Sequence, residues 1–217
     1  MGSDYLSELA AALADGFLVT LRLIGWTLLF ATILGTLLGA MRVSPIAPLR
    51  FFGTSYVNIF RNTPLVVVFL FVVVGLPGVG IGPNFFWRAV ISLSLYTAAF
   101  VCECIRAGVN TVDPGQAEAA RSIGMGFGPS LRHVVLPQAF RAIIPPLVSV
   151  YIAMVKNTSV AYAFGVTEAT YQLKALIEDF PGSLWFNFAG IVAGYILIVA
   201  VLSAIANAFE RRVAVAR

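Results

Sequence analysis

The stretch VDPGQAEAARSIGMGFGPSLRHVVLP, residues 112–137, is a polar island between long apolar runs, and it governs how the rest of the chain is arranged. It carries the signals of a helix start: Asp113 can act as N-cap, Pro114 suits the first helical position, and Gln116 sits where a capping box places an amide. A short helix is therefore predicted to begin here and to end at Gly124. Its small interior residues would let a groove of another protein approach closely, so we expect this loop to dock on a partner.

The composition places the chain in the membrane class. It is 59% hydrophobic and 11% charged, with a mean hydropathy of +0.92, which excludes an ordinary soluble domain. A helix needs about 20 apolar residues to cross a hydrocarbon core of roughly 30 Å. Five runs meet this need: 17–41, 51–74, 86–107, 142–164 and 185–208. The predicted fold is an all-α integral membrane bundle of five transmembrane helices, in one domain covering residues 1–217.

The charges predict an orientation. One set of predicted loops and the C-terminal end carry the arginines, at Arg42, Arg50, Arg106, Arg121, Arg132, Arg141, Arg211, Arg212 and Arg217. The opposite side is acidic, with Asp4, Glu8, Asp15, Glu168, Glu178 and Asp179 against Arg88 and Lys174. By the positive-inside rule the N-terminus is outside and the C-terminus cytoplasmic. The net charge of +4 reflects this asymmetry and is no sign of nucleic-acid binding.

The N-terminal segment is predicted to stay in the mature protein, because its acids stand where a signal peptide has basic residues. Leu6, Leu9, Leu13 and Phe17 recur at helical spacing. A short amphipathic helix at the outer surface is expected here.

The residue types of catalysis and metal binding are scarce. Cys102 and Cys104 are two apart and point to different helix faces, and they read as small buried apolar residues. His133 is the only histidine, and the chain has no GxxxxGK[ST] phosphate loop. We therefore expect no metal site, no cofactor and no covalent chemistry, and any ATPase must be a separate subunit.

Ionisable residues inside predicted spans are costly and usually functional. Counting about 1.5 Å per residue places Arg61 and Lys156 near the bilayer midplane, and each precedes a helix-disturbing sequence, Asn62-Thr63-Pro64 and Asn157-Thr158-Ser159. Either these residues line a substrate path, as in transporters with broken helices, or the two cations bond to carbonyls freed by the breaks. The candidate path residues are Arg22, Arg61, Asn62, Thr63, Lys156, Asn157 and Thr158.

Two further charges have local interpretations. Glu103 and Arg106 lie three apart on one helix face, and a structural charge pair is predicted. Arg22 has no acid nearby on its own helix. It either snorkels outward or faces a central path, where it would attract an anionic group.

One spacing in the island resembles a known family. Glu118-Ala119-Ala120, three residues, Gly124, nine residues, Val134, one residue and Leu136-Pro137 resemble the EAA loop of permease subunits of ATP-binding-cassette importers. Stretches similar to polar amino-acid uptake permeases cover nearly the whole chain: FRNTPL (60–65), LYTAAFVCECIRAGVNTV (95–112), LPQAFRAIIPPL (136–147) and VKNTSVAYAFGVTE (155–168).

The resemblance implies a type I importer permease in a bacterial plasma membrane, paired with a second permease. It also implies an extracytoplasmic substrate-binding protein and an ATPase dimer whose groove takes the EAA helix. The implied coupling residues are Gln116, Glu118, Ala119, Ala120, Ile123, Gly124 and Gly126.

The run MRVSP at 41–45 with GQAEAARSIGMGFG at 115–128 looks most like glutamate-uptake permeases. The implied function is import of a polar amino acid, glutamate foremost, by alternating access. Alternatives are another polar amino acid such as glutamine, or an ion-coupled secondary transporter in which Glu103 is the only intramembrane acid that could carry a proton. A membrane enzyme is disfavoured because no span offers a nucleophile with a base.

Overall fold

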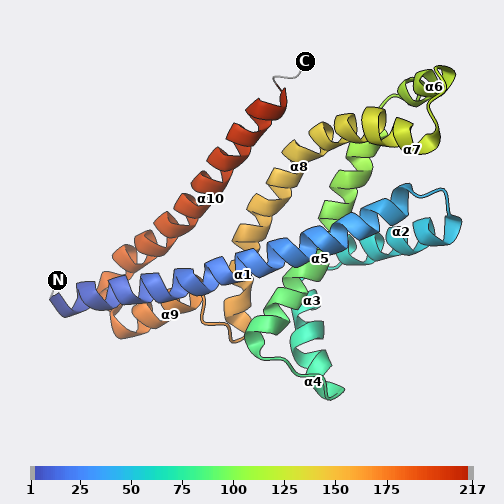
Figure 1. The fold of residues 1–217 in the computed structure, drawn as a ribbon. Helices are drawn as coiled ribbons and strands as arrows, with labels where there is room; N and C mark the ends of the chain where they lie inside the picture. The colour runs from blue at the N-terminus through green and yellow to red at the C-terminus, as the bar shows by residue number, and fades with distance from the viewer. Residues whose placement is uncertain (1–2, 215–217) are drawn as a thin grey trace.

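The computed structural model describes the backbone of residues 3–214 and the side chains of residues 5–208, so Arg217 and the side chains of Asp4, Arg211 and Arg212 lie outside the described part. Every regular element within it is helical (Figure 1). The elements are α1 (Ser3–Val43), α2 (Ala47–Asn62), α3 (Leu65–Leu70), η1 (Phe71–Gly75), α4 (Leu76–Gly78), α5 (Phe85–Asn110), α6 (Pro114–Ser122), α7 (Phe127–Ser130), η2 (Leu131–Val135), α8 (Leu136–Asn157), η3 (Thr158–Phe164), α9 (Ala169–Asp179), η4 (Pro181–Ser183) and α10 (Leu184–Ala214).

In the described part of the chain, four helical stretches are long and apolar enough to cross a membrane: Tyr5–Val43, Phe85–Asn110, Phe127–Phe164 and Pro181–Ala208. The predicted second span is instead a broken pair, Ala47–Asn62 and Leu65–Gly78, with a bend of 106° between its halves.

The break lies at the sequence that predicted it. Pro64 has no N–H to continue the helix, and the residue before a proline is pushed out of helical geometry; Thr63 is accordingly extended, with φ −98° and ψ 129°. The Asn62 side-chain amide donates to the Asn58 carbonyl at 2.8 Å, and the Thr63 hydroxyl donates to the Ile59 carbonyl at 2.8 Å. These two side chains, rather than Arg61, bond the carbonyls at the end of α2.

Helices α1 and α5 pack closely and run in the same direction. A Cβ on Gly35 would lie 2.5 Å from the Val101 side chain, and one on Gly39 would lie 2.8 Å from Ile105, so only glycine fits at either position. Both contacts advance together along the two helices, which makes the pair parallel. The chain between them must therefore return across the membrane, and the broken pair α2–α4 is the element that does so. Counting the bent pair as one span gives the predicted five crossings.

The N-terminal segment differs from its prediction as a separate surface helix. Residues 3–43 form one helix of 41 residues without a break, which runs obliquely across the bundle (Figure 1). The Tyr5 hydroxyl donates to the Asn187 side chain of α10 at 2.7 Å, and a Cβ on Gly194 would overlap the Phe17 ring. The apolar face of this segment covers α9 and α10, which supply the partner that the sequence pattern did not identify.

The end of the broken pair and its connection to α5, residues 75–84, include the short helix α4 at Leu76–Gly78. The Arg88 side chain donates to the Val73 and Pro83 carbonyls at 3.2 and 2.7 Å. It thereby holds the end of the broken crossing against α5.

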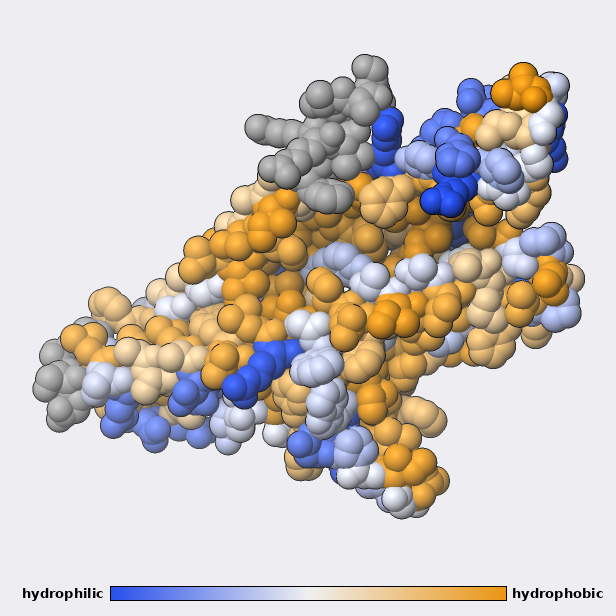
Figure 2. All heavy atoms as spheres, viewed as in Figure 1, coloured by the Kyte–Doolittle hydropathy of each residue, from blue (hydrophilic) through white to orange (hydrophobic). Residues whose placement is uncertain are grey.

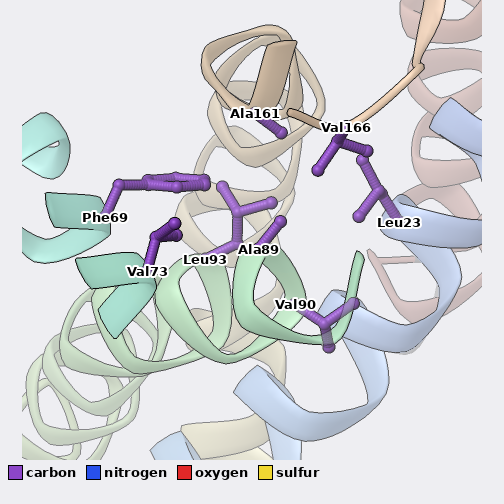
Figure 3. Close-up of a cluster of buried hydrophobic side chains, with 8 residues drawn as sticks. All are labelled: Leu23, Phe69, Val73, Ala89, Val90, Leu93, Ala161 and Val166. Carbon is purple, nitrogen blue, oxygen red and sulfur yellow. The ribbon is translucent and has the colours of Figure 1, made fainter. Parts of the chain in front are cut away.

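A buried cluster joins the elements at this end of the bundle (Figure 3). Leu93 of α5 lies next to the Phe69 ring of α3, whereas Val90 points toward α1 (Figure 3). The two sides of α5 thus pack against different neighbours.

The surface is apolar over most of its area (Figure 2). Hydrophilic residues gather at the end that carries α6 and α7, and at the opposite end along the N-terminal half of α1 and α9 (Figure 2). This is the pattern of a protein whose middle faces lipid.

Candidate functional site

The helix α6 forms in the polar island through the predicted capping. The Asp113 carboxylate accepts a hydrogen bond from the Gly115 backbone N–H at 2.7 Å, and Pro114 opens the helix. Gln116 is exposed and makes no hydrogen bond to Asp113 through its side chain among the described contacts, so only the N-cap half of the capping box is present.

Gly124 ends α6 as predicted, with φ +86°. Its N–H donates to the Arg121 carbonyl at 2.9 Å, and the Met125 N–H donates to the Ala120 carbonyl at 3.0 Å. This bond pair is a Schellman cap, which needs a left-handed residue at Gly124.

The loop presents a mixed surface around that cap. Ile123 and Phe127 are 80% and 79% exposed, and Glu118, Ala119 and Gly126 are exposed beside them. Two large apolar side chains open to water at the hydrophilic end of a membrane protein indicate a surface built for a partner. Phe127 was not among the coupling residues predicted from the sequence. Its position three residues after Gly124 could have placed it on that list.

Ala120 differs from its neighbours in the EAA string because only 4% of it is exposed. Its side chain packs inside this chain and supports the loop from within.

A charge cluster ties three helices together around Glu103. The Glu103 carboxylate bonds Arg106 of its own helix and Arg42 at the end of α1, and it lies 3.7 Å from the Arg61 guanidinium of α2. The structure thus contains the predicted Glu103–Arg106 pair within a larger group of three arginines on one carboxylate. Arg42 and Arg61 were assigned to a loop and to a path, because sequence spacing cannot bring separate helices together.

Arg61 is the most loosely held arginine of this cluster. Its side chain is 43% exposed, and its guanidinium carbon lies 5.5 Å from the centre of the Phe100 ring. Such stacking leaves the edge of the guanidinium fork free to donate hydrogen bonds.

Phe100 also lines a pocket between α5 and α8. The pocket has a volume of about 330 Å³. Its lining residues are Tyr96, Thr97, Phe100, Ser149, Val150, Ala153, Met154 and Asn157. The hydroxyl and amide groups can hydrogen-bond a polar solute, and none of these eight side chains is acidic or basic.

The other candidate path residues lie apart from this pocket. The Lys156 side chain is exposed, makes no hydrogen bond or ion pair with a described residue, and does not meet Arg61. The Thr158 hydroxyl is buried and donates to the Val155 carbonyl at 2.7 Å. Arg22 is exposed on α1 and does not line the pocket.

A buried acid at the opposite end was predicted to lie in an outer loop. Glu168 is fully buried and caps α9 by accepting from the Tyr171 backbone N–H at 3.0 Å and from the Tyr195 hydroxyl of α10 at 2.8 Å. Burial raises the pKa of Glu168, and its hydrogen bonds offset part of that rise. Glutamate is not among the residues usually preferred at an N-cap, so the sequence held no clear signal for this role.

Comparison with known proteins supplies the family. Residues 20–215 match the family model described as binding-protein-dependent transport system inner membrane component. The chain belongs to this family. It is 42% identical over 208 residues to the glutamate transport system permease protein GluC of Corynebacterium glutamicum, covering 90% of this chain and 91% of that protein.

Two further relatives agree. The arginine transport system permease protein ArtQ of Bacillus subtilis is 35% identical over 202 residues, covering 91% of this chain and 90% of that one. A solved structure described as an amino acid ABC transporter with histidines superimposes with a TM-score of 0.87 at 32% identity, covering 98% of this chain and 100% of that chain.

The permease is therefore a multi-pass inner-membrane subunit with the type I importer fold. It works with a substrate-binding protein and a separate ATPase, and ATP hydrolysis takes place on that other subunit.

Proposed function

We propose that this permease imports glutamate by alternating access, with the polar pocket between α5 and α8 as a station on the substrate path. The observation that carries the proposal is the juxtaposition of that pocket with Arg61 over Phe100. The 42% identity to a glutamate permease supports it independently.

The chemistry of the pocket favours an acidic or neutral substrate over a basic one. A lysine or arginine side chain buried there would have no carboxylate among the lining residues to pair with. A glutamate carboxylate can instead reach Arg61, whose planar fork donates two bonds at once. Of the other predicted path residues, Asn157 belongs to the pocket, whereas Asn62, Thr63 and Thr158 bond carbonyls at the ends of their own helices.

The energy would come through the loop of α6 and α7. In this proposal Glu118, Ile123, Gly124 and Phe127 contact a groove of the ATPase, and Gln116, Ala119 and Gly126 border that contact. Closure of an ATPase dimer would then move α5 and α8, because α6 and α7 join these two helices directly.

The proposed assembly has two permease chains, an ATPase dimer and an extracytoplasmic binding protein. The N-terminus faces outward and the C-terminus inward. Support comes from the arginines of the α1–α2 turn and the α6–α7 loop, which the positive-inside rule assigns to the cytoplasm.

Radiolabelled glutamate uptake in cells expressing the whole complex tests the proposal. Unlabelled glutamate should compete, whereas arginine and histidine should not, and ATP depletion should stop uptake. Competition by arginine or histidine without competition by glutamate would overturn the substrate assignment.

Glutamine is a second candidate because the pocket lining is neutral. Its amide could use Asn157 and the hydroxyls without Arg61. This alternative would be favoured if glutamine competed more strongly than glutamate and if Arg61→Ala left glutamine uptake normal.

A further inference from the structure

A second concavity lies on the other side of α5 from the polar pocket. Ile91 and Leu95 line two adjoining hollows of about 320 and 370 Å³. Phe30 of α1 and Trp87 wall the first, and Val67 and Phe71 of the broken crossing wall the second. Because the two hollows share Ile91 and Leu95, they form one apolar trough, which we call the lateral trough.

The lateral trough faces away from the proposed substrate path. Ile91 lies nine residues before Phe100, which is two and a half turns at 3.6 residues per turn, so the two side chains leave α5 in opposite directions. If the polar pocket lines the path, as proposed above, the lateral trough opens to the periphery and therefore to lipid.

A cation stands near one end of the trough. Arg22, Trp26 and Phe30 follow one another at four-residue spacing on the same face of α1. The Trp26 ring packs on Phe30 and lies 5.2 Å from the ring of Trp87. Paired tryptophans next to an arginine are typical of the membrane–water interface.

Arg22 has no ion pair with any described residue. The acid closest to it in sequence is Asp15, seven residues away and therefore about 10 Å along the axis. An exposed guanidinium at the interface attracts phosphate, which it can bind with two hydrogen bonds.

A buried polar atom opens into the same trough. Ser94 lines the hollow beside Phe30, is 5% exposed, and its hydroxyl has no hydrogen-bond partner in the described structure. Leu23 of α1 and Val90 of α5 share one cluster, so Ser94 lies one helical turn, about 6 Å, beyond their level. A buried hydroxyl without a partner costs free energy, and a bound acceptor would remove that cost.

We propose that the lateral trough binds one anionic glycerophospholipid. Its phosphate bonds Arg22, an ester carbonyl accepts from Ser94, and an acyl chain lies over Ile91 and Leu95. A zwitterionic head group would place a second cation next to Arg22, which favours a net anionic lipid such as phosphatidylglycerol.

Native mass spectrometry of the purified whole complex, titrated with phosphatidylglycerol or phosphatidylcholine, tests this site without any transport measurement. Phosphatidylglycerol should bind more tightly than phosphatidylcholine. Arg22→Gln should lower phosphatidylglycerol affinity about tenfold, Ser94→Ala should lower it about threefold, and Ile91→Trp should block both lipids by filling the trough. Lys174→Gln and Ile33→Trp, an exposed charge and an exposed apolar position outside the trough, serve as matched controls and should bind as the unmodified protein does.

Equal retention of the two lipids, or unchanged phosphatidylglycerol affinity in Arg22→Gln, would overturn the proposal. So would a disulfide between two permease chains through Phe71→Cys, since a second copy would then cover the trough. This experiment does not measure uptake. A failed glutamate assignment would therefore not affect the lipid-binding result, and a failed lipid result would not affect the glutamate assignment.

Discussion

Single residues are central to the two functions proposed for this permease, which are coupling to the ATPase and passage of glutamate. Gly124 is an example in the loop, because a residue that tolerates φ +86° is needed to close α6 between the exposed side chains of Ile123 and Phe127. Any other side chain there strains the backbone even though no heavy atom lies within 4 Å of its Cβ position.

Gly124→Ala should reduce coupling of ATP hydrolysis to uptake, because the left-handed conformation costs a non-glycine residue about 1–2 kcal/mol. Glu118→Lys should act in the same direction by reversing a charge on the proposed contact. Reconstituted complexes would be assayed for both ATPase activity and uptake. Gly128→Ala is the matched control, since Gly128 lies in the same loop without a positive φ or a close neighbour. Normal coupling in both Gly124→Ala and Glu118→Lys would refute the docking surface.

Arg61 gives a second prediction at this scale. Arg61→Lys should lower glutamate uptake about tenfold, more than an unchanged charge would suggest, because lysine lacks the planar fork. Arg50→Lys is the control, since the exposed Arg50 side chain bonds only the Ser44 and Pro45 carbonyls among the described residues. Initial uptake rates over a range of glutamate concentrations are the measurement, and full activity in Arg61→Ala would return Arg61 to a structural role beside Glu103.

Asn157 offers a test of specificity. Asn157→Asp would place a carboxylate in a pocket whose lining has none, so glutamate affinity should fall about tenfold through like-charge repulsion. Inhibition by arginine should strengthen. Competition assays on cells with Asn157→Asp, and with Ser149→Ala as a neutral change in the same lining, would check this; an unaltered ranking of competitors would remove the pocket from the path.

At the scale of whole elements, buried polar groups hold helices together, and α9 is an example. Its first N–H, on Ala169, donates to the Thr20 hydroxyl of α1 at 3.2 Å, while Glu168 caps it and accepts from Tyr195 of α10. One turn of chain therefore fastens α9 to both long outer helices.

The raised pKa of Glu168 makes this fastening depend on pH. The folded protein binds the Glu168 proton more readily than the unfolded chain, so stability is fully present below the ordinary carboxyl range and falls as pH rises toward the raised pKa. Glu168→Gln removes the titration and keeps an acceptor oxygen for the Tyr171 N–H, while its amide N–H can donate to the Tyr195 oxygen. The thermal midpoint of the purified complex should decline less with rising pH in Glu168→Gln than in the unmodified protein. Glu178→Gln, an exposed change on the same helix, should show the original slope, and parallel curves for Glu168→Gln would contradict the assignment.

Elements were predictable where the sequence holds the cause locally. Pro64 and its polar neighbours predict the break between α2 and α3. Asp113 and Gly124 predict the two ends of α6. The long-range pairings were not predictable: Arg42 meeting Glu103, Tyr5 meeting Asn187 and the polar pocket all depend on how helices cross, which residue spacing does not encode. The burial of Glu168 was not predictable for the same reason, because the elements that bury it come from distant parts of the chain.

At the scale of the whole molecule, the proposed topology has five crossings and termini on opposite sides of the membrane. Exposed Leu6 and exposed Phe127 lie at the two hydrophilic ends, and the native thiols of Cys102 and Cys104 are buried. The molecule therefore suits a labelling test of its orientation.

In intact cells a membrane-impermeant maleimide should label Leu6→Cys and leave Phe127→Cys unlabelled. After permeabilisation both cysteine variants should react with the maleimide. The protein without added cysteines should remain unlabelled before and after permeabilisation. Labelling of Phe127→Cys in intact cells would reverse the orientation and with it the side on which the ATPase docks.

The long first helix also has a consequence for biosynthesis. Apart from α2, which follows directly, the elements that α1 packs against are α5, α9 and α10, and these leave the ribosome many residues after α1 itself. The first segment to enter the bilayer must wait there, with Gly35 and Gly39 facing lipid, until its neighbours are made. If the nascent chain is released before α9 and α10 are complete, the surface of α1 that packs against them should stay exposed. Quality-control proteases should then degrade the truncated chain.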